Sequence, residues 1–216
     1  MSGQTAAAPS LRERKKQRTR QDLAESALRL FHEQGYDATT LDELVESVQV
    51  SKRTFFRYFE SKEAVAVAAE AELWDAYIDA VDRSASDGEI LATLRDALVE
   101  VTGSLPGDWP ERLFRTRALM GRTPELRAAS MMLAARTQDR LITMLAPRLG
   151  IDAKDLRLRL AVEIALGAYR CGARDWISDR KRGGGKVLAD RIRAAFDAVP
   201  GATSLVGPAT AQTARS

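Results

Sequence analysis

The sequence predicts an all-α protein in which three short helices precede a larger helical region. Alanine, leucine, arginine and glutamate, which are good helix formers, are abundant along the 216 residues. Apolar residues recur at helical spacing, and no run alternates apolar and polar residues as a half-buried strand would. The apolar share of 45% is enough for a sizeable core and argues against a wholly disordered chain.

Capping residues and glycines set the expected helix limits. Gly35 ends the first helix, and Thr40 and Glu43 have the capping-box spacing that begins the second. Ser51 and Ser61 cap the third and fourth helices. Helices are therefore expected over about 11 or 18 to 34, 40–48, 51–59, 62–82, 89–103, 109–120, 124–147, 152 or 155 to 182, and 186–199.

The turn at 48–51 makes the second and third helices a helix-turn-helix candidate. The two ends of the chain consist of small and polar residues with proline and glycine, which is typical of disorder. The expected organisation is a disordered start at 1–10, a helix-turn-helix domain at 11–60, a second helical domain at 61–199 and a disordered tail at 200–216.

Several classes of protein are excluded by composition. No stretch approaches the roughly 18 apolar residues of a membrane-spanning helix, and the N-terminus has no apolar region of a secretory signal. Cys171 is the only cysteine, which suits a reducing cytoplasm. His32 is the only histidine, so little supports metal or nucleophilic chemistry. We expect a cytoplasmic binding protein with no membrane contact, catalytic residue, metal or cofactor, and not an enzyme.

The charge is concentrated near the N-terminus. The whole chain carries only +3, whereas residues 11–20 carry six basic residues and one acid, a net +5. The remainder is therefore slightly acidic. A basic run of this kind is typical of a segment that contacts DNA phosphates or the minor groove, and Arg18 and Arg20 are its candidate contacts. The alternative is a solvated tail that aids solubility.

The third helix has two chemically different sides. Phe55 and Phe59 are four residues apart and are expected to pack against the first two helices. The other side carries cations and an aromatic ring, and arginine can bind guanine through two hydrogen bonds in the major groove. The alternatives are a Phe56 that is core and cations that form an ordinary solvated face. The candidate base and phosphate contacts of this region are Thr40, Lys52, Arg53, Phe56, Arg57, Tyr58 and Lys62.

Residues 35–65, GYDATTLDELVESVQVSKRTFFRYFESKEAV, closely resemble the DNA-binding domain of the tetracycline-repressor (TetR) family. The resemblance is strong over about residues 14–65. It implies that the third helix reads the major groove and that Lys62 contacts phosphate. This chain departs from the family pattern at the turn, with Gln49-Val50 where many members have Gly-Val. It also departs in the third helix, with Arg53 where many have a small residue and Arg57-Tyr58 where many have Tyr-His or Tyr-Tyr, so the operator sequence cannot be transferred. By position the implied DNA contacts are Thr40, Ser51, Lys52, Arg53, Phe56, Arg57, Tyr58 and Lys62.

The same resemblance implies a helical C-terminal domain that dimerises and binds a small effector. The helix expected at 155–180 is apolar on two faces, so it needs two partners, one of which can be a second copy of the chain. The alternative is a helix wholly buried within one subunit. One face carries Leu156, Leu160, Ile164, Gly167 and Cys171. We assign the dimer interface to the other face and to the last helix, through Leu158, Val162, Leu166, Tyr169, Leu188, Ile192 and Phe196.

The effector site is expected among the aromatic and methionine residues of the second domain. Methionine is an adaptable lining for an apolar ligand, although such residues at helical spacing are more often core. The region 111–180 also loosely resembles the regulators that bind acyl-CoA-like ligands, whose phosphates arginines would bind. The candidates are Trp74, Tyr77, Trp109, Phe114, Arg117, Met120, Met132, Arg136 and Tyr169.

Together these features predict a homodimeric, ligand-responsive transcriptional regulator, in this family most often a repressor, that binds a palindromic operator in double-stranded DNA. A small apolar or acyl-CoA-like effector would release it. Two alternatives stay open at this point. One is a helical enzyme or lipid carrier whose basic face is incidental, and the other is a DNA-binding dimer without a ligand.

Overall fold

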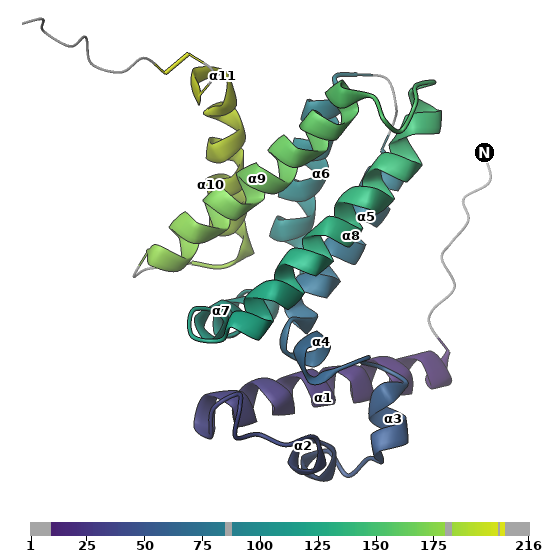
Figure 1. Ribbon diagram of the computed structural model, residues 1–216, viewed down its shortest axis with the longest axis vertical. Coiled ribbons are helices and arrows are strands. Elements are labelled where there is room, and N and C mark those ends of the chain that lie inside the picture. The colour runs from purple at the N-terminus through teal and green to yellow at the C-terminus, as the bar shows by residue number, and fades with distance from the viewer. Residues whose placement is uncertain (1–9, 85–87, 180–182, 203, 206–216) are drawn as a thin grey trace, which may run out of the picture. The chain divides into compact units, whose positions relative to one another are not determined.

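The computed structural model describes residues 10–84, 88–179, 183–202 and 204–205, and within these ranges it contains eleven helices and no strand (Figure 1). The all-α class predicted from the sequence is confirmed. The helices are α1 (Leu11–Glu33), α2 (Leu41–Ser47), α3 (Lys52–Phe56), α4 (Lys62–Ala66), α5 (Ala68–Arg83), α6 (Ile90–Ser104), α7 (Trp109–Met120), α8 (Pro124–Arg148), α9 (Leu156–Ser178), α10 (Gly185–Asp197) and α11 (Val199–Ala202).

The chain divides into two compact units. The first comprises Met1–Ile78 and Leu105–Asp139, so it holds α1 to α4, α7 and parts of α5 and α8. The second comprises Asp79–Ser104 and Arg140–Ser216, with α6, α9, α10 and α11. The helix-turn-helix candidate therefore lies in the first unit, together with α7, which comes much later in the sequence.

The start of α1 is fixed by a capping box. The Ser10 hydroxyl accepts a hydrogen bond from the Glu13 amide at 3.2 Å, and the Ser10 amide donates to the Glu13 carboxylate at 2.8 Å. Of the two expected starts, the one at residue 11 is correct. Ser10 is thus part of the helix cap and not of a disordered end, while residues 1–9 lie outside the described residues.

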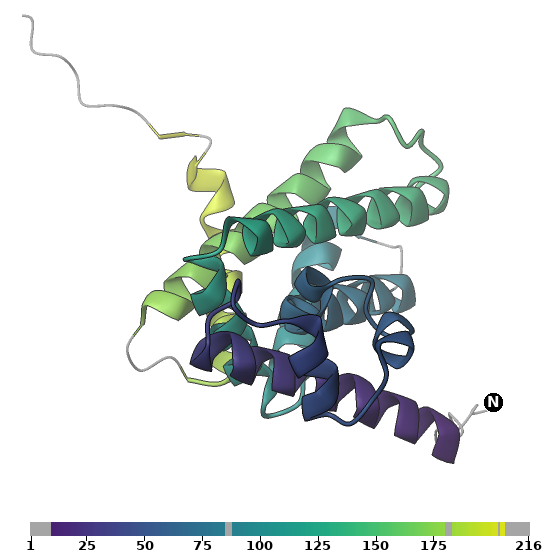
Figure 2. The ribbon, with the colours of Figure 1, turned by 60° about the horizontal axis from the view of Figure 1, so that its bottom comes forward.

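The core of the first unit is built as the sequence predicts. Leu23 and Phe31 of α1 and Leu44 of α2 are buried against Phe55 and Phe59. The two phenylalanine rings lie 5.8 Å apart, and Phe55 is fully buried. In Figure 2, α1 runs alongside the short helices that carry these side chains. Packing against α1 therefore fixes which side of α3 faces outward.

Two expected helices differ from the structure. The third ends at Phe56 and not near Phe59, because the last turn tightens: the Tyr58 amide donates to the Phe55 carbonyl at 2.8 Å. The expected helix at 62–82 is two helices, α4 and α5, separated at Val67, whose φ of −97° and ψ of 16° leave the helical region.

The C-terminal helices also differ slightly from expectation. Asp155 caps α9 by accepting a hydrogen bond from the Arg157 amide at 2.9 Å, and α9 ends at Ser178. Residues 200–202, expected to be disordered, belong to α11, because proline is compatible with the first turn of a helix. The remainder of the expected tail, apart from residues 204–205, lies outside the described residues.

In the second unit, α6, α9 and α10 pack against one another, and Figure 1 shows α9 crossing α10. The crossing depends on Gly172 of α9. A Cβ atom at this position would lie 2.8 Å from the Cα and the amide nitrogen of Ile192 in α10, closer than real contacts allow. Glycine at 172 therefore permits the two backbones to approach each other.

Gly172→Ala is expected to destabilise the protein by about 1–3 kcal/mol, because an added methyl group must displace the α10 backbone. Urea denaturation measures the change. Gly103→Ala in α6 is the control, since its added methyl group would meet no atom within 4 Å. That variant is expected to be neutral or up to about 1 kcal/mol more stable. Equal stability of the two variants would contradict the packing role of Gly172.

Candidate nucleic-acid interface

The exposed side of α3 carries the residues that the sequence singled out. Ser51 caps the helix by accepting a hydrogen bond from the Thr54 amide at 3.1 Å. Lys52, Arg53 and Arg57 are exposed, and α3 contains no acidic residue. The Phe56 side chain is 55% exposed, so the alternative that it belongs to the core is wrong. The structure thus brings three cations and one aromatic ring together on one surface.

The three cations of this surface have different surroundings. The Lys52 ammonium lies 2.8 Å from the Asp42 carboxylate of α2. The Arg57 guanidinium stacks over the Tyr58 ring at 5.0 Å and donates to the Tyr58 hydroxyl at 3.2 Å. Arg53 is exposed and has no ion-pair partner among the residues that the structure describes. Its guanidinium therefore has all its donors available for a ligand.

The N-terminus of α2 is closed by its own capping box, as the sequence predicts. The Glu43 amide donates to the Thr40 hydroxyl at 3.2 Å, and the Thr40 amide donates to the Glu43 carboxylate at 2.8 Å. Hydrogen bonds from the backbone and then the side chain of Thr40 lower the pKa of Glu43. The Thr40 hydroxyl also donates to this carboxylate at 2.9 Å, so it is engaged within the protein.

Lys62 holds the turn between α1 and α2. Its ammonium donates to the carbonyls of Tyr36 at 2.8 Å and Thr39 at 3.1 Å, and lies 4.1 Å from the centre of the Tyr36 ring. Two of its three donors are therefore used inside the protein. The Tyr36 hydroxyl donates to Glu63, and burial together with this bond raises the pKa of Tyr36. In this structure Lys62 therefore holds the residues before α2 in place. The sequence had assigned it only to a DNA phosphate.

The basic segment at 11–20 is helical and belongs to α1. Residues 11–18, including Arg18, are exposed on every side of the helix. Arg20 is half-buried, and its guanidinium carbon lies 5.3 Å from the centre of the Phe59 ring. Arg18 is thus accessible to DNA, whereas Arg20 packs against the ring of Phe59, just after α3.

The expected effector residues fall into three groups. Tyr77, Trp109 and Tyr169 are fully buried, and Trp74 and Met120 are almost so, so in this conformation they are core. Tyr169 lies in the second unit and the other four in the first. Phe114 and Arg117 are half-buried. Met132 and Arg136 are exposed and line an open hollow of about 400 Å³ with Arg20, Tyr58, Phe59 and neighbouring residues.

A buried acid that the sequence reasoning missed lies beside Arg117. Glu70 of α5 is 1% exposed, and its carboxylate lies 2.7 Å from the Arg117 guanidinium of α7. The Ser130 hydroxyl of α8 donates to the same carboxylate at 2.6 Å. Glu70 and Glu72 are the two glutamates in an otherwise apolar run at 64–74, and this pattern was the available signal. Arg136 instead pairs with Glu60 at 3.0 Å, so the structure does not bring these two arginines to one ligand site.

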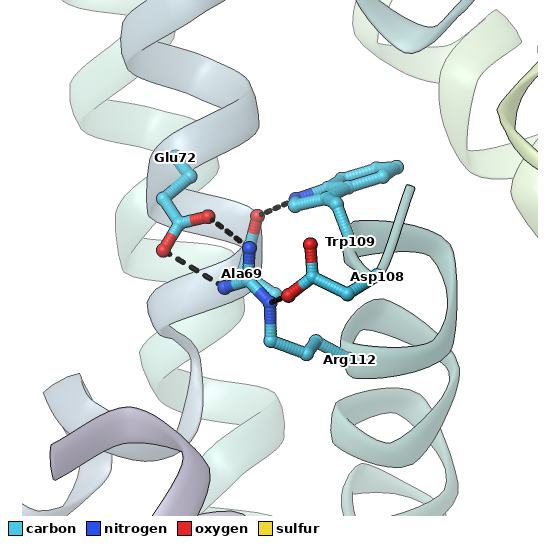
Figure 3. Close-up of polar contacts among 5 residues, drawn as sticks. All are labelled: Ala69, Glu72, Asp108, Trp109 and Arg112. Atoms are coloured by element: carbon cyan, nitrogen blue, oxygen red, sulfur yellow. Dashed lines mark hydrogen bonds and ion pairs between the residues drawn. The ribbon is translucent and has the colours of Figure 1, made fainter. Parts of the chain in front are cut away.

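Figure 3 shows the contacts that join the start of α7 to α5. The Arg112 guanidinium donates to both Glu72 carboxylate oxygens at 2.9 and 2.8 Å and to Asp108 at 2.9 Å. Trp109 donates through its indole nitrogen to the Ala69 carbonyl at 2.8 Å. Burial alone would lower the pKa of Arg112, but hydrogen bonding and charge from Glu72, with Asp108, raise it above its ordinary value.

The residues that we assigned to the dimer interface are already covered within one subunit, so the assignment is corrected. All seven, four on one face of α9 and three on α10, are buried because α6, α9 and α10 pack against one another. The opposite face of α9 is exposed: Leu156 is 67% and Leu160 60% accessible. The pattern showed two apolar faces but not which one the subunit itself covers. The buried residues are Leu158, Val162, Leu166, Tyr169, Leu188, Ile192 and Phe196.

Within the described residues, no helix combines the length and the apolar character needed to cross a bilayer. In the same ranges, no group of three or more histidine, cysteine, aspartate or glutamate side chains is arranged to hold a metal ion.

Two family models match the chain in tandem. Residues 23–69 match the model described as bacterial regulatory proteins of the tetR family, and residues 88–202 match the MftR C-terminal domain. The transcriptional regulator TcmR of Streptomyces glaucescens is 36% identical over 174 residues, which are 78% of this chain and 77% of TcmR. The regulator MftR of Mycobacterium tuberculosis, named for mycofactocin biosynthesis, is 24% identical over 86% of this chain and 91% of MftR.

Among solved structures, the fold is similar to that of FadR from Thermus thermophilus, described as a TetR-family repressor in complex with lauroyl-CoA. The TM-score is 0.52 at 24% sequence identity, covering 89% of this chain and 98% of FadR. At this identity the likeness shows a shared fold.

Proposed function

Because the chain belongs to the TetR family of bacterial transcriptional regulators, we propose that it represses transcription by binding a near-palindromic operator as a homodimer. We further propose that a small apolar or acyl-CoA-like effector releases it. Family membership makes the chain a transcriptional regulator and not an enzyme, as predicted from its sequence. The operator, the dimer and the effector are the parts of the proposal that need experiment.

The exposed cationic side of α3 carries the DNA-binding part of the proposal. Lys52, Arg53 and Arg57 are exposed whereas Phe55 is buried, and the basic helical segment of α1 lies in the same unit. Arginine can bind guanine through two hydrogen bonds, while the aromatic ring of Phe56 can contact a thymine methyl group. These are the side chains that a helix in the major groove needs.

The exposed apolar face of α9 supports the homodimer. Leu156 and Leu160 are largely accessible, and Ile164, Gly167 and Cys171 continue the same face along the helix. A second copy related by a two-fold axis would cover this face with an identical one. The dimer would then present two copies of α3 to half-sites one helical turn, or a multiple of it, apart.

The effector part rests on Arg117, the half-buried Phe114 and their neighbours. The ion pair between Arg117 and Glu70 supplies polar groups inside an otherwise apolar region of the first unit. FadR of Thermus thermophilus is described with lauroyl-CoA bound. An acyl chain could pack on the apolar residues, and its anionic head would compete with Glu70 for the Arg117 guanidinium. A ligand with higher affinity for one conformation would shift the dimer away from the DNA-binding one.

Selection of bound sequences from a pool of random DNA duplexes tests operator binding. The wild-type protein is expected to enrich one near-palindromic site, with binding that falls steeply as salt is raised. Arg53→Ala is expected to weaken binding to that site by about 1–3 kcal/mol and to relax one base position in each half-site. Arg83→Ala, at an exposed arginine in the second unit, is the control. Enrichment of no sequence would refute operator binding.

Thermal denaturation with added ligand tests the effector. Lauroyl-CoA at about 100 times its dissociation constant is expected to stabilise the protein by about 2.7 kcal/mol. It should also reduce binding to the selected operator. The control ligand is coenzyme A without the acyl chain. Stabilisation by neither compound, with operator binding unchanged, would refute an acyl-CoA effector and favour a regulator without this ligand.

A further inference from the structure

One acidic side chain lies at the edge of the proposed DNA-reading surface. Asp42 is in the first turn of α2, and both of its carboxylate oxygens approach the Lys52 ammonium, at 2.8 and 2.9 Å. Lys52 is the first residue of α3. If Lys52 faces the major groove, the Asp42 carboxylate must face it too, because the two groups are in contact.

This ion pair is exposed. The Asp42 side chain is 74% accessible and the Lys52 side chain 52%. Exposed pairs of this kind contribute little to folding stability. A carboxylate at a DNA-binding surface also repels phosphates, so it opposes general affinity for DNA. Its place in the first turn of α2 lets Asp42 interact favourably with the helix dipole. Its contact with Lys52 has a second effect, on the direction of the Lys52 ammonium.

Lysine is a point charge on a flexible stem, and alone it can reach phosphates as easily as bases. The Asp42 carboxylate attracts the ammonium toward α2 and occupies one of its three donors. The remaining donors are then aimed at the base edges, where guanine offers two acceptors in the major groove. An acid at this place also penalises sites that offer Lys52 only a phosphate.

We propose that Asp42 is a positioning residue that determines operator specificity by directing Lys52 to a guanine and away from the phosphate backbone. This inference rests on the proposed operator binding. It assigns to Asp42 a role that follows from its contact with Lys52 and not from its own contact with DNA.

The experiment uses the full-length protein and selection from a random duplex pool. Lys52→Ala first identifies the base pair that Lys52 reads, as the position whose preference is lost. Asp42→Asn is expected to relax the preference at that same base pair by at least about fivefold, the lower end of what one good base contact provides. It should also strengthen binding to random duplex and steepen its salt dependence by up to about 0.9 in log–log slope, because Lys52 is free to pair with a phosphate.

Glu46→Gln is the matched control, since it removes one exposed acid from the same helix without touching Lys52. It is expected to leave base preference unchanged. In a Lys52→Ala background, Asp42→Asn should have no further effect on specificity, which a general loss of structure or charge would not explain. Circular dichroism checks that each variant folds.

Four results would overturn the inference. Three concern the acids: an unchanged base preference in Asp42→Asn, an equal change in Glu46→Gln, and an effect of Asp42→Asn that persists without Lys52. The fourth is a Lys52→Ala variant that loses no base preference. A wild-type protein that enriches no sequence would instead refute operator binding itself, so the two failures can be distinguished.

Discussion

Leu160→Glu is expected to convert the proposed dimer to a monomer and to weaken operator binding by about 100-fold or more, because avidity from two linked half-site contacts is worth 10²–10⁴. Leu160 is 60% exposed in the middle of the uncovered α9 face. A carboxylate there would be buried in an apolar interface without a partner, and its desolvation opposes that arrangement. Sedimentation measures the mass, and a gel-shift measures the binding.

Leu205→Glu is the control for this prediction. It makes the same chemical change at a leucine that is 85% exposed and lies outside the α9 face. Mass and operator affinity should both stay at wild-type values. A Leu160→Glu protein that is still dimeric, or a wild-type protein that is monomeric at micromolar concentration, would exclude this face as the interface.

Arg112→Ala is expected to lower the free energy of unfolding by about 3 kcal/mol, the lower end of the range for breaking a buried ion pair, because Glu72 retains some access to water. Arg112 is 6% exposed and joins α7 to α5 through Glu72. Without it, the Glu72 carboxylate loses two charge-assisted hydrogen bonds and is left partly buried. Urea denaturation followed by circular dichroism measures the loss.

Two variants make this second prediction specific. Arg115→Ala removes a half-buried arginine from the same helix and is expected to cost less than about 1 kcal/mol, as most substitutions outside such networks do. Arg112→Met combined with Glu72→Leu replaces the pair with apolar groups and should recover most of the stability. If Arg112→Ala were as stable as wild type, or the double variant no more stable than Arg112→Ala, the ion pair would not stabilise the packing of α7 on α5.

The helical architecture and the exposed surface of α3 could be predicted because their signals are local. Capping serines and threonines, Phe55 and Phe59 four residues apart, and the glycine after α1 each act within one or two turns. The break at Val67 was missed since nothing in that alanine-rich run disfavours helix locally. Gln49 adopts a positive φ of 54°, in the left-handed region that glycine favours.

The contacts that sequence could not supply are those between distant helices. Arg112 and Glu72 are 40 residues apart, and Ser130 and Glu70 are 60 apart, so no periodic pattern links them. The two faces of α9 could not be told apart from sequence for the same reason. Both are apolar, and only the packing of α6 and α10 shows which face the subunit itself covers. Hydrogen bonds to the backbone of distant residues also escaped the sequence pattern. Lys62, assigned to DNA, already donates to backbone carbonyls before α2.

The capped start of α1 has a thermodynamic consequence. With Ser10 and Glu13 closing the helix, the cations of the basic segment are held on a formed scaffold before DNA is present. A flexible basic arm would lose conformational entropy on ordering, and its binding would show the large negative heat-capacity change of coupled folding. For a preformed helix, calorimetry should instead register little more than the surface buried at the interface. The segment would then act as a rigid rod of charge, with about 1.5 Å of rise per residue.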